Sequence, residues 1–322
     1  MNKYFEKIIL ESTNSKEIDK IQEIQELWGG YGKIFRYILS RSDLKSVIVK
    51  NVRLPDRGKK SRDSDISFQR KLKSYKVEMA FYKNWSKKCE ENCRVADWYA
   101  FEWQNNEFLM VFEDLDLAGF KGRRSSVTWN EVKLCLKWLA NFHATFMGEK
   151  PEGLWTKGTY WHLETRPDEL RALKDIRLKN AAKKIDTKLN NCRFKTFVHG
   201  DAKLANFCFS EDKSSVAAVD FQYVGGGCGM KDVAYFIDSC LYDEECEALE
   251  KEILDFYFEE LEKALKIREK DIDFNALEKE WRKLYPVAWA DFYRFLKGWA
   301  LGHYESKYSE GIINKVVESL NM

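Results

Sequence analysis

The chain has 322 residues, more than one ordinary hydrophobic core holds, so we expect one large domain or two packed domains. Its 54 Lys and Arg residues nearly balance its 52 Asp and Glu residues, and the net charge of +2 argues against binding nucleic acid or an anionic membrane through overall charge. No apolar run approaches the length of a membrane span, and the eight cysteines lack the spacing of a zinc site, so we expect a reduced, cytoplasmic protein.

The first 28 residues are rich in charge, and their isoleucines recur at every third position, which predicts a loose helix. A glycine-rich turn follows and leads into a stretch, 34–39, with strand character. A glycine turn before a strand can fold its backbone N–H groups over phosphates. The candidates for such contact are Gly29, Gly30 and Gly32. The turn matches no established nucleotide-binding motif, so a plain hairpin turn stays open as the alternative.

A β-branched strand, 46–50, ends in Lys50, in the manner of the Val-Ala-Ile-Lys strand of kinases. After a polar segment, 55–65, that is predicted as a loop, apolar residues alternate three and four apart and predict a long helix. Glu78 lies beside the apolar stripe of this helix. An ion pair between Lys50 and Glu78 would hold the ammonium group on the α- and β-phosphates of ATP. The alternative for Lys50 is an ordinary strand-end residue that faces solvent.

Two further strands are predicted at 95–101 and 107–112, after which the pattern changes from period two to helical. We predict the boundary between two lobes there, with an N-terminal lobe at 1–115 and a C-terminal lobe at 116–322. The backbone of the connection would face the adenine of a nucleotide. The candidates for this contact are Glu113 and Leu115.

The most informative stretch has the spacing His-x-Asp-x-x-x-x-Asn, followed by Asp-Phe. Two apolar runs, 207–209 and 216–219, flank a polar turn and predict a hairpin. Asp201 precedes the hairpin, Asn206 stands at its start and Asp220 ends its second strand. This is the spacing of a kinase catalytic loop and metal-binding aspartate. There, one carboxylate orients the attacking hydroxyl, while an amide and a second carboxylate hold Mg²⁺ on the phosphates of ATP. The non-catalytic alternative is a polar loop beside a hairpin.

Three features near this stretch have less specific interpretations. The glycine run at 225–229 lacks the Gly-Lys-Ser/Thr ending of a phosphate-binding loop and is predicted as a mobile segment near the site. Asp232 is predicted to cap the N-terminus of the next helix. His143, at the end of a predicted helix, is expected to be a core histidine rather than a catalytic one.

Aromatic residues are unusually dense from residue 281 to residue 308. Most of them are expected to lie in the core, but such a surplus can also line a pocket for an apolar or cationic small molecule. The candidates for substrate contact are Trp289, Asp291 and Tyr293.

Taken together, these residues resemble the aminoglycoside phosphotransferase and choline kinase superfamily within the protein-kinase-like fold, and in particular its ecdysteroid-kinase-like branch. The resemblance is strongest from His199 to Gln222 and extends over nearly the whole chain. It implies an α+β, two-lobed fold with a small β-rich N-lobe and a larger, mainly helical C-lobe. It also implies ATP and Mg²⁺ as cofactors.

Residue by residue, the resemblance implies that Asp201 is the catalytic base and that Asn206 and Asp220 hold the metal. Lys50 and Glu78 would form the phosphate-positioning pair. A further candidate is Lys203, which occupies the position where some kinases contact the γ-phosphate, although superfamily members vary there.

The departures from protein kinases favour a small-molecule substrate. His-Gly-Asp replaces His-Arg-Asp, Asp-Phe-Gln replaces Asp-Phe-Gly, and no Ala-Pro-Glu segment follows. We therefore expect a kinase that phosphorylates a hydroxyl group of a largely apolar small alcohol. The alternatives are a choline- or aminoglycoside-type kinase, a nucleotide-binding pseudokinase that serves as an interaction module, and a nucleic-acid-binding protein that uses the basic stretch 45–88. The sequence does not reveal the oligomeric state.

Overall fold

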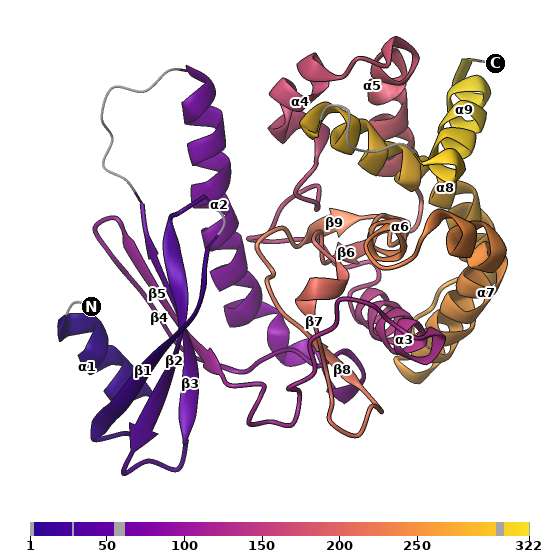
Figure 1. Cartoon of the computed structure of the whole chain (residues 1–322). Helices are drawn as coiled ribbons and strands as arrows, with labels where there is room; N and C mark the ends of the chain where they lie inside the picture. The colour runs from indigo at the N-terminus through magenta and orange to yellow at the C-terminus, as the bar shows by residue number, and fades with distance from the viewer. Residues whose placement is uncertain (1–2, 28, 55–61, 301–305, 322) are drawn as a thin grey trace.

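The computed structural model describes residues 3–27, 29–54, 62–300 and 306–321, which form a small lobe built on a β-sheet and a larger, mainly helical lobe (Figure 1). This is the α+β, two-lobed arrangement that the resemblance implies. Helix α2 (Arg62–Asn84) stands between the sheet and the helices of the larger lobe (Figure 1). Residues 55–61 of the predicted loop at 55–65 lie outside the described residues, whereas 62–65 belong to α2 and are not a loop. No helix in the described part of the chain is both long and apolar enough to cross a membrane.

The small lobe contains a five-stranded antiparallel sheet with the strand order β1-β2-β3-β5-β4. Its strands are β1 (Glu17–Glu26), β2 (Gly32–Ser40), β3 (Ser46–Arg53), β4 (Trp98–Gln104) and β5 (Glu107–Glu113). Successive side chains of a strand point to opposite faces. Strand β3 accordingly buries Val47 and Val49 against helix α1 (Lys3–Ser12), whereas Val52 packs on the α2 side. Lys50, two residues before Val52, therefore points toward α2.

The larger lobe contains helices and two short strand pairs. Its helices are α3 (Trp129–Thr145), α4 (Pro167–Ala172), α5 (Ile176–Asn190), α6 (Met230–Asp238), α7 (Asp243–Ile267), α8 (Phe274–Trp299) and α9 (Lys307–Asn321). The strand pairs are β6 (Thr196–Val198) with β9 (Gly225–Gly227) and β7 (Phe207–Phe209) with β8 (Val216–Ala218), both antiparallel. The predicted hairpin is therefore confirmed to within one residue at its second strand.

The prediction of a helix up to residue 27 is wrong for the second half of that segment. A helix forms at α1, but residues 17–26 form the edge strand β1. The pairing of β1 with β2 shifts register twice, between Ile18 and Lys20 and between Glu23 and Gln25. Each bulge inserts a residue and interrupts the alternation of side chains. Isoleucines three residues apart, which suggest a helix, thus occur in a strand.

The glycine run that was expected to be mobile is a buried strand instead. Residues Gly225 to Gly227 pair with β6, and Gly225 also bridges to Trp155. A Cβ atom on Gly225 would lie 2.1 Å from the carbonyl oxygen of Trp155. Glycine is needed here for the close approach of two backbones rather than for flexibility.

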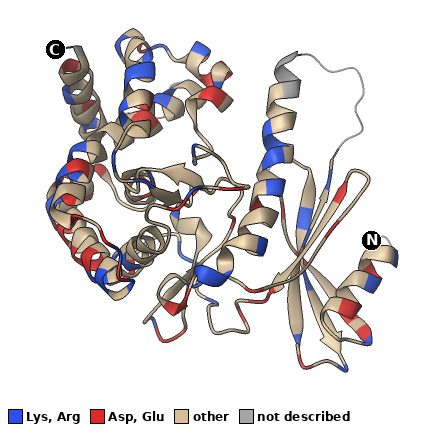
Figure 2. Ribbon diagram, turned by 180° about the vertical axis from the view of Figure 1, so that it is seen from behind, with Lys and Arg blue, Asp and Glu red and all other residues tan. Residues whose placement is uncertain are grey.

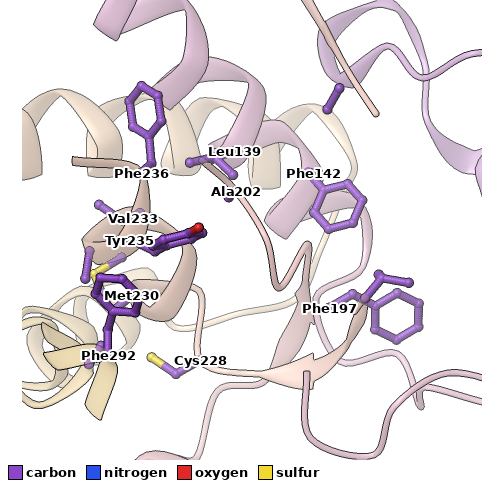
Figure 3. Packing of buried hydrophobic residues seen from close by; sticks show 14 of the residues in the cluster. Leu139, Phe142, Phe197, Ala202, Cys228, Met230, Val233, Tyr235, Phe236 and Phe292 are labelled. Carbon is purple, nitrogen blue, oxygen red and sulfur yellow. The ribbon is translucent and has the colours of Figure 1, made fainter. Parts of the chain in front are cut away.

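An aromatic cluster joins the two lobes. Phe81 of α2 stacks on Phe221, with ring centroids 4.2 Å apart, and also contacts Phe142 and Phe146 of the larger lobe. The side chain of Phe81 is fully buried. Figure 3 shows part of the adjoining core around Phe142, with residues of α6 such as Tyr235 across from it. The packing of Phe81 therefore fixes α2 against the C-lobe.

We predict that Phe81→Ala lowers the free energy of unfolding by about 3–5 kcal/mol, because it removes a buried ring and leaves a cavity between the lobes. Denaturant unfolding followed by circular dichroism measures this change. Ile267→Ala, at a side chain that is 72% exposed, is the control and should change stability by about 0.5 kcal/mol or less. A loss of under about 1 kcal/mol for Phe81→Ala would contradict a stabilising role of this cluster.

Candidate active site

A cluster of three charged side chains lies between the sheet and α2, with Lys50 and Glu78 buried and Asp220 partly exposed. Lys50 Nζ is 2.7 Å from Glu78 Oε2 and 3.5 Å from Asp220 Oδ1. The side chains of Lys50 and Glu78 are only 5% and 3% exposed, so the ion pair predicted from the sequence forms inside the protein. Burial alone would lower the pKa of Lys50, but the carboxylates of Glu78 and Asp220 outweigh it and raise that pKa, so the ammonium group stays charged.

Asp201 and Asn206 meet in the loop between β6 and β7. Asn206 Nδ2 donates to the carbonyl oxygen of Asp201 at 2.7 Å and to its Oδ2 at 3.1 Å, and Tyr235 Oη donates to Oδ1 at 3.2 Å. Burial, together with the charge of Asp220, raises the pKa of Asp201 to about 7, although Lys203 and these hydrogen bonds oppose the change. Both carboxylate oxygens of Asp201 are thus held in a fixed direction.

His199 links this loop to the strand that precedes Asp220. Its Nε2 lies 3.0 Å from the carbonyl oxygen of Val219, and its Nδ1 lies 3.2 Å from the backbone N of Asp201. A carbonyl can only accept and a backbone N–H can only donate, so the proton belongs on Nε2. Burial lowers the pKa of His199, which keeps the imidazole neutral and suited to both bonds. His199 is therefore a positioning residue for the two aspartates.

Asp232 holds the same loop from α6, a role that the sequence did not indicate. Its Oδ2 accepts from the backbone N of His199 at 2.5 Å, and its Oδ1 accepts from the backbone N of Gly200 at 2.9 Å. His143, as predicted, is a buried core histidine, and its Nε2 lies 3.1 Å from Asp232 Oδ2. The prediction that Asp232 caps its own helix is wrong: Gly229 is the N-cap residue, and Asp232 turns to the catalytic loop.

Gly200 has a specific steric reason to be glycine. Its φ is +79°, a conformation that side chains disfavour, and a Cβ atom there would lie 2.2 Å from the carbonyl oxygen of Tyr223. An arginine at this position, as in the His-Arg-Asp motif of protein kinases, would therefore displace the backbone of Tyr223.

Gln222 ties Asp220 to α2, and it too was missed as a functional residue. Its Nε2 donates to Asp220 Oδ1 at 2.8 Å, while its Oε1 accepts from Ser74 Oγ at 3.1 Å and from Lys71 Nζ at 3.2 Å. Asp220 has a φ of +70°, which costs free energy and persists only where neighbours hold it. Burial and the charge of Lys50 lower the pKa of Lys71 to about 8. The contacts of Gln222 explain why a large amide suits this position.

The donor set at Asn206 and Asp220 fits a hard divalent cation. Asn206 uses its Nδ2 atom for Asp201, which leaves its amide oxygen free of these bonds. Asp220 Oδ1 accepts a hydrogen bond from Gln222 and forms an ion pair with Lys50, which leaves Oδ2 free of these two contacts. The backbone N of Val219 donates to the carbonyl oxygen of Asn206 at 3.0 Å and so joins the two segments. Carboxylate and amide oxygens are ligands that Mg²⁺ accepts, with phosphate and water completing its shell.

The predicted nucleotide-contact glycines lie at the β1–β2 turn. Gly29 and Gly30 have φ values of +87° and +71°, and Gly32 begins β2. Two residues later, Ile34 pairs with Lys50 across the sheet. The turn is therefore about 7 Å along the strand from the residue opposite Lys50. Contact of these glycines with phosphates stays a prediction.

Glu113 and Leu115 lie where the chain leaves the sheet at the end of β5. The carboxylate of Glu113 accepts from Arg94 Nη2 at 2.6 Å and from the backbone N of Asp97 at 2.9 Å. Leu115 is buried, and its carbonyl oxygen accepts from the backbone N of Phe120 at 2.8 Å. The contact of this connection with adenine stays a prediction.

Lys203 lies beside Asp201, with its Nζ 3.6 Å from Asp201 Oδ2. Its side chain is 42% exposed, so the ammonium group can reorient toward an incoming anion. The predicted contact with a γ-phosphate is compatible with this position and stays a prediction.

The three predicted substrate residues of α8 are buried and have partners inside the C-lobe. Trp289 Nε1 donates to Ser309 Oγ at 2.9 Å, and Tyr293 Oη donates to Asp238 Oδ1 at 2.9 Å. Asp291 accepts from Arg294 Nη2 at 3.0 Å and, in addition, from the indole of Trp161. All three side chains thus have partners within the C-lobe, and substrate contact by Trp289, Asp291 and Tyr293 stays a prediction. The density of aromatic residues at 281–308 mainly reflects the core.

The comparisons with known proteins agree with this geometry. The ecdysteroid kinase-like family model matches residues 37–153 and 155–269, more than two-thirds of the chain. An aminoglycoside phosphotransferase from Streptomyces rimosus has a TM-score of 0.50 at 11% identity, with 89% of this chain and 98% of that chain covered. An ethanolamine kinase from Plasmodium vivax has a TM-score of 0.50 at 12% identity, with 92% of this chain and 82% of that chain covered.

At such low identity, the two solved structures establish the fold and nothing finer. A search of curated proteins found no match. The family model, in contrast, spans both lobes and includes Lys50, Glu78 and the segment from Asp201 to Asp220. The chain therefore belongs to the ecdysteroid kinase-like family.

Proposed function

We propose that this protein is an ATP- and Mg²⁺-dependent kinase that transfers the γ-phosphate of ATP to a hydroxyl group of a largely apolar small alcohol. The observation that carries the proposal is the buried contact of Lys50 with both Glu78 and Asp220. A lysine fixed in this way beside a metal-binding carboxylate is what positions a triphosphate in kinases. Asp201, with its two oxygens oriented by Asn206 and Tyr235, supplies the carboxylate for the acceptor hydroxyl.

Each of these residues would have a separate role in phosphate transfer. Lys50 holds the phosphates, and its partner Glu78 keeps the ammonium group in place. Asn206 and Asp220 would hold Mg²⁺, which when bound neutralises developing charge on the phosphates. Asp201 accepts the proton of the acceptor hydroxyl, and its pKa of about 7 suits a general base at neutral pH.

The surroundings of Asp201 support an acceptor with an apolar body. The ring of Tyr160 lies 5.6 Å from that of Tyr235, which contacts Asp201, and 5.3 Å from that of Phe295. The carboxylate considered for a quaternary amine, Asp291, is already balanced by Arg294, and this argues against a choline-like acceptor there. Burial of apolar surface would stabilise a bound alcohol by about 25 cal/mol per Å².

We expect Asp201→Asn to lower phosphate transfer by roughly a hundredfold or more, the usual range for loss of a general base. ATP binding should stay largely intact, because Asp201 faces the acceptor. Turnover and nucleotide affinity are measured on the same sample, with Asp19→Asn at an exposed site of β1 as the matched control. Unchanged turnover would remove Asp201 from the mechanism.

Asp220→Ala should abolish Mg²⁺-dependent ATP binding, because it removes the chief protein charge on the metal. Asn206→Ala should weaken this binding less, since a neutral amide contributes less. Gln222→Leu, which keeps the size but loses the bond to Asp220, should weaken it by roughly tenfold, as removal of an outer-shell partner does. Calorimetric titration with ATP at several Mg²⁺ concentrations measures these effects, with Gln25→Leu on the exposed face of β1 as the control. Equal affinity of Asp220→Ala and the parent would refute the metal assignment.

An ATP-consumption screen tests the substrate class directly. The panel contains sterols, terpenoid alcohols, choline-like amines and aminoglycosides. We expect turnover with hydroxylated apolar compounds, because aromatic rings border Asp201. Turnover confined to amines or aminoglycosides would contradict the proposed acceptor, and no turnover with any alcohol would favour the pseudokinase.

A further inference from the structure

Two arginines from different lobes meet beside the candidate active site. Arg70 belongs to α2, and its Nη1 donates to the carbonyl oxygen of Thr165 at 2.6 Å. The next residue along the chain is Arg166, whose Nε donates to the carbonyl oxygen of Tyr160 at 2.8 Å. Arg70 is thus hydrogen-bonded to the residue directly before Arg166, and the charge of Arg166 acts on Arg70. Lys and Arg recur along α2, as Figure 2 shows, but only Arg70 reaches this loop through a hydrogen bond in the described part of the chain.

A short chain of contacts connects this pair to Asp201. The guanidinium of Arg166 lies 5.9 Å from the ring centroid of Tyr160. The backbone N of Tyr160 donates to the carbonyl oxygen of Gly200 at 3.1 Å, directly before Asp201. Tyr223, whose ring is 5.9 Å from that of Tyr160, lies within electrostatic range of both arginines and of Asp201. The arginines therefore border the same aromatic surroundings as the predicted base.

The two positive charges of this pair have one nearby carboxylate, Glu169. Arg166 has a carboxylate partner, Glu169, with Nη1 and Oε1 3.1 Å apart. Arg70 has no carboxylate within 4.0 Å among the described residues, but Glu169 lies within electrostatic range of it. Its side chain also hydrogen-bonds Tyr223 and the hydroxyl of Ser67, the latter at 3.1 Å. Burial and the neighbouring charge of Arg166 lower the pKa of Arg70. Two partly buried cations that share one carboxylate keep a net positive charge, which an anionic ligand would offset.

We propose that Arg70 and Arg166 bind an anionic group, a carboxylate, sulfate or phosphate, that the acceptor alcohol carries in addition to its reactive hydroxyl. This inference rests on the proposed kinase function and narrows its substrate class. Guanidinium groups bind such oxyanions through paired, parallel hydrogen bonds. The apolar body of the acceptor would lie on Tyr160 and Phe295, since the guanidinium of Arg166 is 5.1 Å from the ring centroid of Phe295.

The position of the pair favours the acceptor over ATP as the source of the anion. The nucleotide side of the site already has Lys50 beside Asp220, and Lys71 reaches Gln222. Arg166 contacts Tyr160 and Phe295 of α8, and Tyr160 packs on Tyr235, which hydrogen-bonds Asp201. A purely structural clamp is also a poor explanation, because a neutral donor would satisfy the carbonyl of Thr165 without placing a second positive charge next to Arg166.

The test uses matched acceptors that differ in one charge: cholate and its methyl ester, and 12-hydroxydodecanoate and its methyl ester. For each pair we measure kcat/KM, and separately the binding affinity by calorimetry in the presence of ADP and Mg²⁺. The parent protein should prefer the anionic member of a pair by about tenfold or more, the effect of one guanidinium–carboxylate contact. Arg70→Gln and Arg166→Gln should remove most of this preference, and Arg70→Lys should retain part of it. Arg53→Gln, at a side chain that is 81% exposed, is the control.

The preference ratio separates recognition from a structural role, because loss of packing would weaken both members of a pair equally. Equal binding of acid and ester by the parent would overturn the proposal, and so would an unchanged ratio in correctly folded Arg70→Gln and Arg70→Lys proteins. A raised KM for ATP with an unchanged ratio would assign the arginines to the nucleotide and contradict the acceptor assignment. If no alcohol is phosphorylated, the kinase proposal fails, but the calorimetric ratio still decides whether the arginines bind the anion.

Discussion

The structure depends on an ion pair that is held out of water between the lobes, together with a third, partly exposed carboxylate. Lys50 contacts Glu78 and Asp220. The side chains of Lys50 and Glu78 are almost completely buried. Removing each ion from water costs several kcal/mol, which the mutual attraction offsets only while all partners stay in place. The alternation of β3 points Lys50 toward α2, and the docking of α2 brings Glu78 to it. The site can therefore form only when the sheet, α2 and the C-lobe are assembled together.

Helix α2 is the element that makes this assembly cooperative. It contacts three successive residues of the motif after β8 in three different ways. Glu78 of α2 forms an ion pair with Lys50, which in turn contacts Asp220. Phe81 of α2 stacks on Phe221. Ser74 of α2 donates a hydrogen bond to Gln222. Charge, aromatic packing and hydrogen bonding thus all act on the orientation of one carboxylate. Any movement of α2 would change the surroundings of Asp220, so under the proposed function nucleotide binding would be coupled to the relative position of the lobes.

Much of this could be predicted from the sequence because the relevant signals are local. Asp201, Asn206 and Asp220 lie within one short stretch of recognisable spacing. The pairing of Lys50 with Glu78 could be predicted because the strand and the helix that contain them have clear periodicity. The failures have physical causes. Two bulges give β1 a three-residue spacing of isoleucines, which suggests a helix. The glycines of β9 reflect close contact between backbones rather than flexibility. The contacts of Asp232, Gln222 and the Arg70–Arg166 pair depend on packing between distant segments, for which a single sequence carries no signal.

The most direct measurement is a crystal structure of the protein with Mg²⁺ and a non-hydrolysable ATP analogue. The account predicts that the metal is bound by the oxygens of Asn206 and Asp220, and that Lys50 keeps its contact with Glu78 while it binds the α- and β-phosphates. It also predicts that the terminal phosphate faces Asp201. A nucleotide bound elsewhere, or a metal that does not contact Asp220, would contradict the central claim.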